Sequence, residues 1–288
     1  MPYELKEDIA QYLSPSDLAE LALVDKALLL FCRMKLHRSL DLTEEKKLQQ
    51  WLGDKSKQNS EILSCVRILL CTIEKEYEGN VKEFLESHLP KFPKLTHLTL
   101  RVPVLFDRFE TPFPFTGTLQ VLSLNSCSIS FRGLVTLLNQ LTNLAQLTLS
   151  GIASAVDEKS GGPEPKLSNY LRNLTVSYWN PRDKVVDKLS TLKLGCQELS
   201  LNITQNQTAA QNFINGSKDS LRRLDLINTV GSMYPNNPII YPGIADWKPW
   251  FCSRLQQTSY ALCLQRTAHG QDEFVEYKTG PLGSHFVN

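Results

Sequence analysis

The sequence predicts an α/β fold in which strand–helix units repeat along the chain, after a small helical domain. A pattern of alternating leucines recurs at a nearly constant interval, and the segments between its copies carry apolar residues at helical spacing. The first forty residues show helical spacing alone. Because strands that return through helices at a fixed period pair in parallel, we expect a parallel sheet with helices on its other face.

Three short helices are expected in residues 1–40. Leu5, Ile9 and Leu13 recur at four-residue spacing, which places them on one face of a first helix. The run Ser-Pro-Ser-Asp at 14–17 is typical of a helix start, because the serine can cap the helix and the aspartate can reach back to that cap. The residues expected to face inward are Leu18, Leu21 and Val24 in this second helix, and Leu30, Phe31 and Met34 in a third helix over Ala27–Leu36.

A unit of about forty residues rarely folds alone without a disulfide or a metal, and neither is indicated here. Part of its apolar surface is therefore expected to be covered by the rest of the chain or by another protein. The positions of proline and the spacing of the leucines together match one sequence motif. Its residues in this chain are Pro2, Glu4, Leu5, Ile9, Leu13, Ser14, Pro15, Asp17, Leu18, Leu21, Val24 and Lys26.

This N-terminal pattern resembles the F-box, which in its family docks onto the Skp-type adaptor of a cullin–RING ubiquitin ligase. The resemblance implies the same role for residues 1–40. It implies adaptor contacts for Pro2, Leu5, Ile9, Leu13, Pro15, Leu18, Leu21 and Val24. The alternative is a helical cap that closes the end of the following domain.

Residues 41–64 are polar and carry charges of both signs. Leu48, Trp51 and Leu52 are placed to share one face of a helix, and Gly53 favours a turn after it. Mixed charges usually form a solvated surface. We therefore expect a linker helix here and assign it no function.

A Leu-x-x-Leu-x-Leu pattern dominates residues 65–230. Its copies begin at Leu95, Leu119, Leu144, Leu171, Cys196 and Leu221, spaced by 24, 25, 27, 25 and 25 residues, and an earlier copy begins at Val66. The pattern resembles the leucine-rich repeat, whose period is about 20–29 residues. The resemblance implies a solenoid with parallel strands on a concave face and helices on a convex face.

The segments between the copies have the spacing of short helices. Apolar residues recur at helical intervals within 81–89, 134–141, 185–192 and 209–214. Gly195 is expected to cap the third of these helices, and Cys127 is expected to pack in the core. The gap at 150–166 departs from the pattern, and its Gly-Gly-Pro run predicts a loop.

Residues that alternate with the leucines would point away from the core and line the concave sheet. The residues assigned to target binding are His97, Thr99, Arg101, Ser123, Asn125, Gln146, Thr148, Asn173, Thr175, Glu198, Ser200, Arg223 and Asp225. They are polar and together nearly neutral, with charges towards the two ends of the set. Such a surface favours hydrogen-bonded recognition of a protein or peptide, and a merely solvated sheet is the alternative.

Residues 231–288 lose the repeat and are expected to form a C-terminal cap and an irregular tail. Trp247, Trp250 and Phe251 could close the open edge of the last repeat or form a small ligand patch. A last strand is expected around Leu262 and Leu264.

Composition and motifs argue against several other functions. A net charge of +1 disfavours binding to nucleic acids or anionic membranes through bulk charge. The N-terminus lacks the pattern of a signal peptide, and the seven cysteines contain no Cys-x-x-Cys pair, which favours reduced thiols in the cytoplasm or nucleus. Nucleotide-binding loops and hydrolase motifs are absent from the sequence, and its five histidines are scattered. We therefore expect no catalytic residue, no metal and no cofactor.

The two resemblances combine in one hypothesis. A chain with an F-box-like start followed by leucine-rich repeats resembles the F-box/leucine-rich-repeat proteins, and the irregular repeats are similar to those of fungal members. Membership implies a non-catalytic substrate receptor of an SCF-type ubiquitin ligase, which binds a Skp-type adaptor, through it a cullin scaffold, and an unknown target protein. A leucine-rich-repeat scaffold with no ligase role is the alternative.

Overall fold

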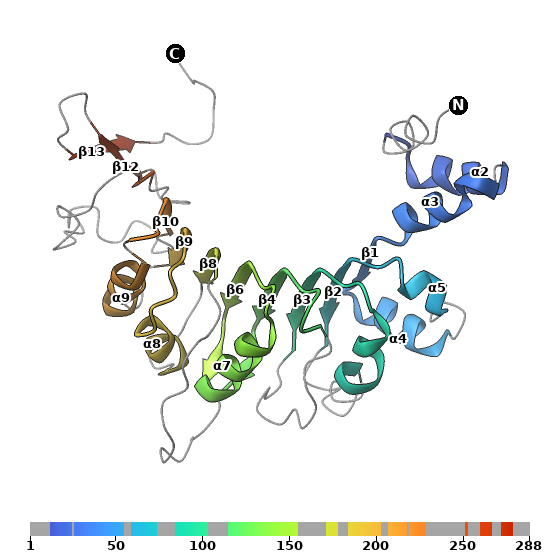
Figure 1. Ribbon diagram of the computed structural model, residues 1–288, viewed down its shortest axis with the longest axis horizontal. Helices are drawn as coiled ribbons and strands as arrows, with labels where there is room; N and C mark the ends of the chain where they lie inside the picture. Colours follow the sequence, from blue (N-terminus) through green and yellow to red (C-terminus); the bar gives the residue numbers. More distant parts are fainter. Residues whose placement is uncertain are drawn as a thin grey trace. The chain divides into compact units, whose positions relative to one another are not determined.

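Eight strands form a mostly parallel sheet, which confirms the predicted α/β class (Figure 1). The computed structural model describes residues 12–24, 26–54, 59–73, 84–102, 115–154, 171–177, 184–202, 207–217, 219–227, 251–252, 260–266 and 272–278. The strands, in the order in which they lie in the sheet, are β1 (Ser39–Leu42), β2 (Ile68–Thr72), β3 (His97–Arg101), β4 (Val121–Asn125), β6 (Gln146–Ser150), β8 (Asn173–Ser177), β9 (Glu198–Asn202) and β10 (Arg223–Ile227).

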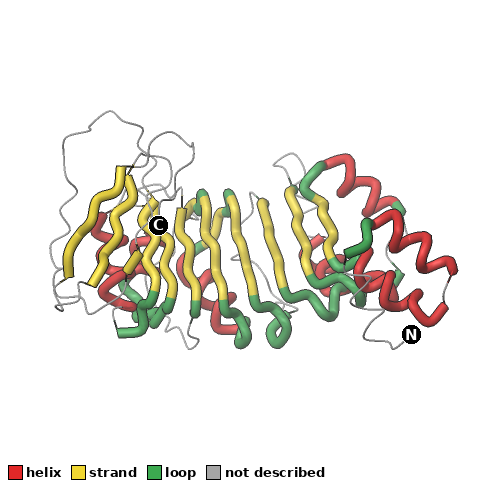
Figure 2. The backbone as a smooth tube through the Cα atoms, turned by 90° about the horizontal axis from the view of Figure 1, so that it is seen from above, coloured by secondary structure: helices red, strands yellow, loops and turns green. Residues whose placement is uncertain are grey.

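The chain divides into two compact units. The N-terminal unit comprises Met1–Cys127 and Gln140–Leu144, and the C-terminal unit comprises Ser128–Asn139 and Ala145–Asn288. The first contains strands β1 to β4, and the second contains β6, β8, β9 and β10. Figure 2 shows the strands of each unit running side by side.

Two helices, α2 (Pro15–Val24) and α3 (Lys26–Leu36), pack against each other in the N-terminal unit. The predicted capping box is confirmed. The backbone N–H of Asp17 donates to Ser14 Oγ at 3.2 Å, while the backbone N–H of Ser14 donates to Asp17 Oδ2 at 3.3 Å. The core of the pair consists of Leu18, Leu28, Phe31 and Cys32.

The prediction that Val24, Leu30 and Met34 face inward is wrong. Their side chains are 84%, 66% and 43% exposed. Leu28, Phe31 and Cys32 occupy the inner face of α3 at helical spacing, so Leu30 and Met34 lie on its opposite side.

The sheet begins earlier than the sequence predicted. β1 pairs in parallel with β2, with Leu40 opposite Leu69 and Leu42 opposite Cys71. Residues 41–64 are therefore not a linker: they contain the end of β1 and the helices α4 (Glu45–Gly53) and α5 (Ser60–Leu63). The predicted boundaries at 40 and 64 thus fall inside the packed N-terminal unit.

Trp51 of α4 anchors this segment in an aromatic cluster. Its ring stacks on Phe92 at 5.9 Å and meets Phe84 and His88 edge-on at 6.2 and 5.5 Å. Phe84 and His88 belong to the π-helical turn η3 (Phe84–His88), which the 3₁₀ turn η4 (Leu89–Lys91) follows. The helix predicted around Leu48 and Trp51 is thus present as α4, which buries these two side chains at 3% exposure and leaves its charged and polar residues exposed.

The predicted leucine pattern forms rows across the strands. In the N-terminal unit, Leu69, Leu98 and Leu122 lie opposite one another, and each is fully buried. Two residues further along the same strands, Cys71, Leu100 and Leu124 form the next row. Each copy of the pattern thus contributes one strand.

The C-terminal unit repeats this arrangement with helices behind the strands. Its helices are α7 (Phe131–Gln140), α8 (Lys184–Ser190) and α9 (Gln207–Ser217), which lie on the same side of the strands (Figure 1). The predicted apolar stripes are buried in α7 and α8. Gly195 does not cap α8 but has a positive φ of 63° in the turn before β9.

Two smaller sheets complete the described residues of this unit. β5 (Ser128–Ile129) pairs in parallel with β7 (Ala153–Ser154), and the loop predicted at 150–166 lies mostly outside the described residues. β11 (Phe251–Cys252), β12 (Tyr260–Arg266) and β13 (Asp272–Lys278) form an antiparallel sheet. The predicted last strand is present as β12. The prediction of an irregular tail after it is wrong for residues 272–278, which form β13. Trp247 and Trp250 lie outside the described residues.

Replacing a leucine of the central rows is expected to destabilise the protein strongly. Leu98 is fully buried, so Leu98→Ala should lower the free energy of unfolding by about 3 kcal/mol through lost burial and the cavity that remains. The neighbouring Thr99→Ala, on the opposite face of β3, should cost about 0.5 kcal/mol. Urea denaturation of both variants checks this, and equal losses would contradict the assignment of faces.

Candidate protein-interaction surfaces

The strand residues that alternate with the leucine rows form the open face of the sheet. All of the predicted target-binding residues lie on it, because each is partly or fully exposed between buried neighbours on its strand. The structure thus confirms their position in the fold, and binding by them stays a prediction. The structure adds residues of β1 and β2 to this face, namely Ser39, Asp41, Ile68, Leu70 and Thr72.

The open face of the N-terminal unit combines apolar and basic residues. In one row, Ile68, His97 and Val121 are neighbours across β2, β3 and β4. In a parallel row, Arg101 lies between Thr72 and Asn125. Each of these residues is half-buried except Arg101, which is exposed.

Hydrogen bonds hold two ionisable groups of this face. The Nδ1 atom of His97 lies 2.8 Å from Thr96 Oγ1, which itself bonds to the carbonyl of Arg67 at 3.0 Å. Asp41 accepts bonds from the N–H and the hydroxyl of Thr43 at 2.9 and 2.6 Å, and these bonds lower the pKa of its carboxyl. The Asp41 carboxylate is therefore engaged within its own turn.

Polar residues of the open face of the C-terminal unit bind one another. Asn173 Nδ2 donates to Glu198 Oε2 at 3.1 Å, and Arg223 pairs with Asp225 at 2.9 Å. Asn173 Oδ1 is buried without a hydrogen-bond partner among the described residues, so one acceptor on this face is unsatisfied. Thr175, two residues further along the same strand, lies opposite Thr148 of β6 and Ser200 of β9, which also carry hydroxyl groups.

A second surface, here called the outer helical face, lies on and beside α2 and α3. It carries large apolar side chains that are strongly exposed: Tyr12 (84%), Leu23 (87%), Val24 (84%), Leu30 (66%) and Met34 (43%). These five are the exposed large apolar side chains among the described residues, and all lie on or beside α2 and α3, which makes this face a candidate interaction site.

The predicted adaptor residues divide into four groups. Pro15 and Val24 are exposed, and Leu13 and Leu21 are half-buried. Leu18 is 6% exposed and belongs to the core of the helix pair, so its prediction as a contact residue is wrong. The predicted positions Pro2, Leu5 and Ile9 lie outside the described residues. Sequence reasoning missed Leu23, Leu30 and Met34.

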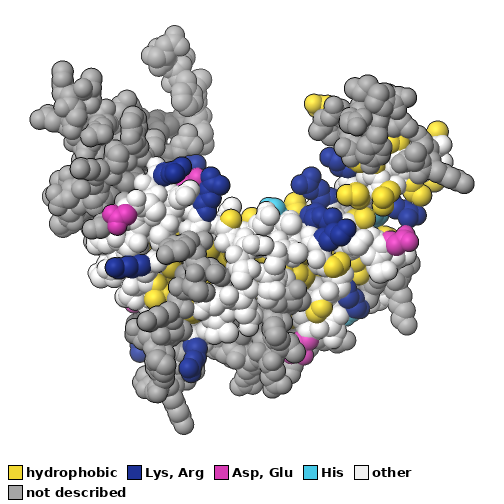
Figure 3. Space-filling model, in the orientation of Figure 1, with side chains coloured by type: hydrophobic (Ala, Val, Ile, Leu, Met, Phe, Trp, Pro, Cys, Tyr) yellow, Lys and Arg dark blue, Asp and Glu magenta, His cyan; other side chains and the backbone are white. Residues whose placement is uncertain are grey.

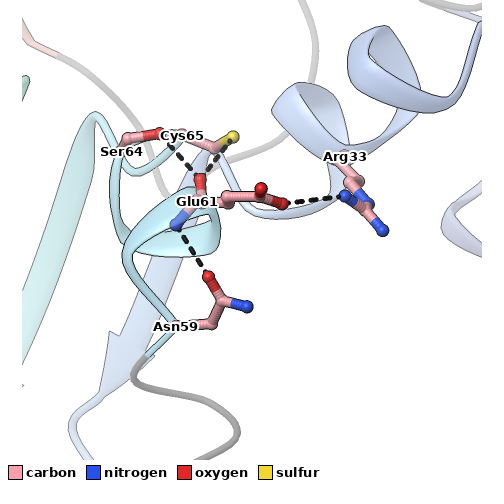
Figure 4. Close-up of polar contacts among 5 residues, drawn as sticks. All are labelled: Arg33, Asn59, Glu61, Ser64 and Cys65. Carbon is pink, nitrogen blue, oxygen red and sulfur yellow. Dashed lines mark hydrogen bonds and ion pairs between the residues drawn. The ribbon is translucent and has the colours of Figure 1, made fainter.

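A small polar network connects α3 with α5 (Figure 4). Arg33 Nη1 lies 3.2 Å from Glu61 Oε2. Glu61 is the second residue of α5, and its N–H donates to the capping side chain of Asn59 at 2.8 Å. Both ends of the Arg33–Glu61 pair are largely exposed, so this pair contributes little to stability.

A pocket of about 250 Å³ lies behind β1. It is lined by His37, Ser39, Leu40, Trp51, Ile62, Leu63 and Val66. Burial, and then the positive charge of Arg33, lower the pKa of His37, which keeps this imidazole neutral near pH 7. Its lining is almost entirely apolar, with His37 and Ser39 as the residues that carry polar side chains. Across the described residues, no group of three His, Cys, Asp or Glu side chains could hold a metal ion.

Buried thiols recur beside the leucine rows. Burial raises the pKa of Cys71 and of Cys196 to about 12, and that of Cys127 to about 11. The Sγ atom of Cys127 lies 3.3 Å from the carbonyl of Asn125. These thiols are fully or almost fully buried, so they act as small apolar residues, as predicted for Cys127.

Comparisons with known proteins give no family for this chain. A scan of protein-family models gives no match, and a search of curated proteins gives none either. In the parts of the chain that the structure describes, no helix combines the length and apolar character that crossing a membrane requires.

The raised thiol pKa values predict a loss of stability at alkaline pH. Above pH 8.5, a thiol of the unfolded chain ionises while Cys71 stays protonated in the folded chain, so the unfolded state is favoured. Stability should be fully present below about pH 8.5 and should fall by about 1.4 kcal/mol per pH unit for this group, until its folded pKa is reached. Chemical denaturation from pH 8 to 10 of the protein and of Cys71→Val measures this. Parallel pH profiles would contradict it.

Proposed function

We propose that this chain is the substrate-recognition subunit of an SCF-type cullin–RING ubiquitin ligase. Its outer helical face would dock a Skp-type adaptor as an F-box does, and the open face of its leucine-rich-repeat solenoid would bind a target protein. The observation that carries the proposal is the exposure of Leu23, Val24, Leu30 and Met34 on a capped helix pair that leads directly into the first repeat strand. Such a receptor acts in the cytoplasm or the nucleus.

The exposed apolar residues favour a partner because the folded chain itself gains nothing from them. Fully burying a leucine or methionine side chain contributes roughly 1.5–3 kcal/mol. Among the described residues nothing covers these side chains, and a partner protein that covers this face would make that contribution. In the proposed complex, the chain supplies no chemistry of its own and brings a bound target close to the ligase machinery.

The alternative is a repeat scaffold in which the two helices only cap the sheet. A cap contributes by burying its apolar face against the sheet that it closes. Leu23, Val24 and Leu30 are at least 66% exposed, so they make no such contribution. Their exposure favours the receptor over the scaffold.

Placing a charge on the outer helical face should abolish adaptor binding without unfolding the chain. Leu23→Asp and Leu30→Asp introduce carboxylates at exposed positions, where folding tolerates them but burial against an adaptor does not. In a pull-down with a purified Skp-type adaptor, the original chain should bind, and each variant should lose about tenfold or more in affinity.

The matched control is Gln49→Asp, which introduces the same charge at an exposed position of α4. This variant should bind the adaptor as the original chain does. Absence of binding by the folded original chain, or equal binding by all variants, would contradict the proposal.

A further inference from the structure

We propose that the outer edge of strand β1, together with the apolar pocket beside it, binds an extended peptide segment of another protein as an additional strand. The bound segment would continue the sheet beyond β1 and place one apolar side chain in the pocket. The inference goes beyond the proposed receptor function, because it uses neither the outer helical face nor the open face of the sheet.

β1 is the first strand of its sheet, and its register shows which main-chain groups have no partner (Figure 1). The carbonyl of Arg38 accepts the N–H of Ile68 at 3.0 Å, and Ser39 lies opposite Ile68. Bonding groups alternate along a parallel strand, so Leu40 directs its N–H and carbonyl to β2, while Ser39 and Asp41 direct theirs outward. Among the described residues, no main-chain group binds these outward groups.

The exposure of β1 agrees with an uncovered edge. Ser39 and Asp41 are exposed, whereas their neighbours on β2, Ile68 and Leu70, are half-buried. Leu40 is half-buried too, although the leucines that continue its row on β2, β3 and β4 are fully buried. At β10, the last strand of the sheet order, β11 lies alongside. The leucine row is therefore open at β1.

The pocket of about 250 Å³ lies beside this edge, because Ser39 and Leu40 belong to its lining. Most of the remaining lining consists of apolar side chains of α4 and α5. An apolar cavity of about 150 Å³ holds a benzene ring, so this pocket has room for a leucine or phenylalanine side chain. Figure 3 shows hydrophobic side chains (yellow) reaching the surface in this part of the N-terminal unit.

An added strand would use the edge and the pocket together. A peptide that pairs with β1 satisfies the outward groups of Ser39 and Asp41, and its side chains alternate between the two faces of the sheet. The peptide residue that continues the leucine row would lie next to Leu40, on the side of the sheet that carries the pocket. Arg38 and Asp41 have opposite charges, so the pocket, and not charge, selects the peptide.

Two other readings of this edge are less favourable. β1 is short and contains the charged Asp41, as protected edges often do, but it has no proline, lysine or bulge that would block an added strand. A second copy of β1 would bring only Leu40 and Leu42, and in each chain Leu40 already lines the pocket and Leu42 is buried. A peptide from another protein can supply the missing apolar side chain.

Subtractive selection from a library of random twelve-residue peptides displayed on phage tests the inference. Phage are depleted on Ser39→Pro, which lacks one outward N–H, and are then selected on the original full chain. Proline is compatible with the first residue of an edge strand, so this variant should fold. The selected peptides should carry apolar residues at alternating positions.

A fluorescein-labelled synthetic copy of the most enriched peptide should bind the original chain. Its affinity should fall about tenfold in Ser39→Pro, which cannot donate to the peptide, and in Ile62→Trp, whose larger side chain fills the pocket. Two further copies, methylated on alternate sets of backbone nitrogens, should differ, because only one set faces β1. Fluorescence anisotropy measures the affinities, and circular dichroism verifies that the variants are folded.

The matched controls are Ser39→Ala, which keeps the N–H, and Ile68→Trp, which places the same ring on the open face and outside the pocket. Both should bind within about twofold of the original chain. No selected peptide, equal affinity in all variants, or equal binding by the two methylated copies would overturn the inference. So would a dimer of the original chain that dissociates in Ser39→Pro, because a second copy would then occupy the edge. The experiment uses no adaptor, so its failure is distinguishable from failure of adaptor docking.

Discussion

The register of the parallel ladder is the constraint on which the rest of this structure depends. The carbonyl of the residue just before one strand accepts two successive N–H groups of the next repeat: Arg67 O accepts from Thr96 and His97, both at 2.9 Å. Arg172 O binds the N–H groups of Gln197 and Glu198 in the same way. This repeated contact aligns the leucines in rows, and a slip of one residue would turn every leucine to the open face.

Repetition explains why much of the sheet could be predicted. Each copy of the leucine pattern is a weak signal, but six copies at a nearly constant interval predicted β3, β4, β6, β8, β9 and β10, and an earlier copy predicted β2. The apolar stripes between the copies predicted α7, α8 and α9. The sequence did not predict β1, because its four residues contain only two leucines, Leu40 and Leu42. It is a strand because it pairs with β2. The buried side of α3 was predicted wrongly for another reason. Its run Leu28–Phe31 is apolar throughout, so only packing against α2 decides which side is buried.

The candidate surfaces, too, could be predicted only in part from the periodicity of the sequence. Alternation with the leucines placed His97, Thr99 and the other polar residues on the open face correctly. Ile68 and Leu70 were missed because residues 68–71 are apolar at every position, and no alternation distinguishes the two faces of that strand. Sequence periodicity therefore located the face, whereas its aliphatic part became visible only once the neighbouring strands fixed the register.

Positions that the fold leaves free carry the most information about function. Buried Leu98 or Leu122 is explained by the ladder, and a polar open-face residue such as Thr175 is explained by solvent. Neither reason applies to Leu23 or Leu30, nor to Ile68, whose apolar surface faces water at a cost that the folded chain does not recover. All three lie in the N-terminal unit, so the positions that the fold does not explain are concentrated there.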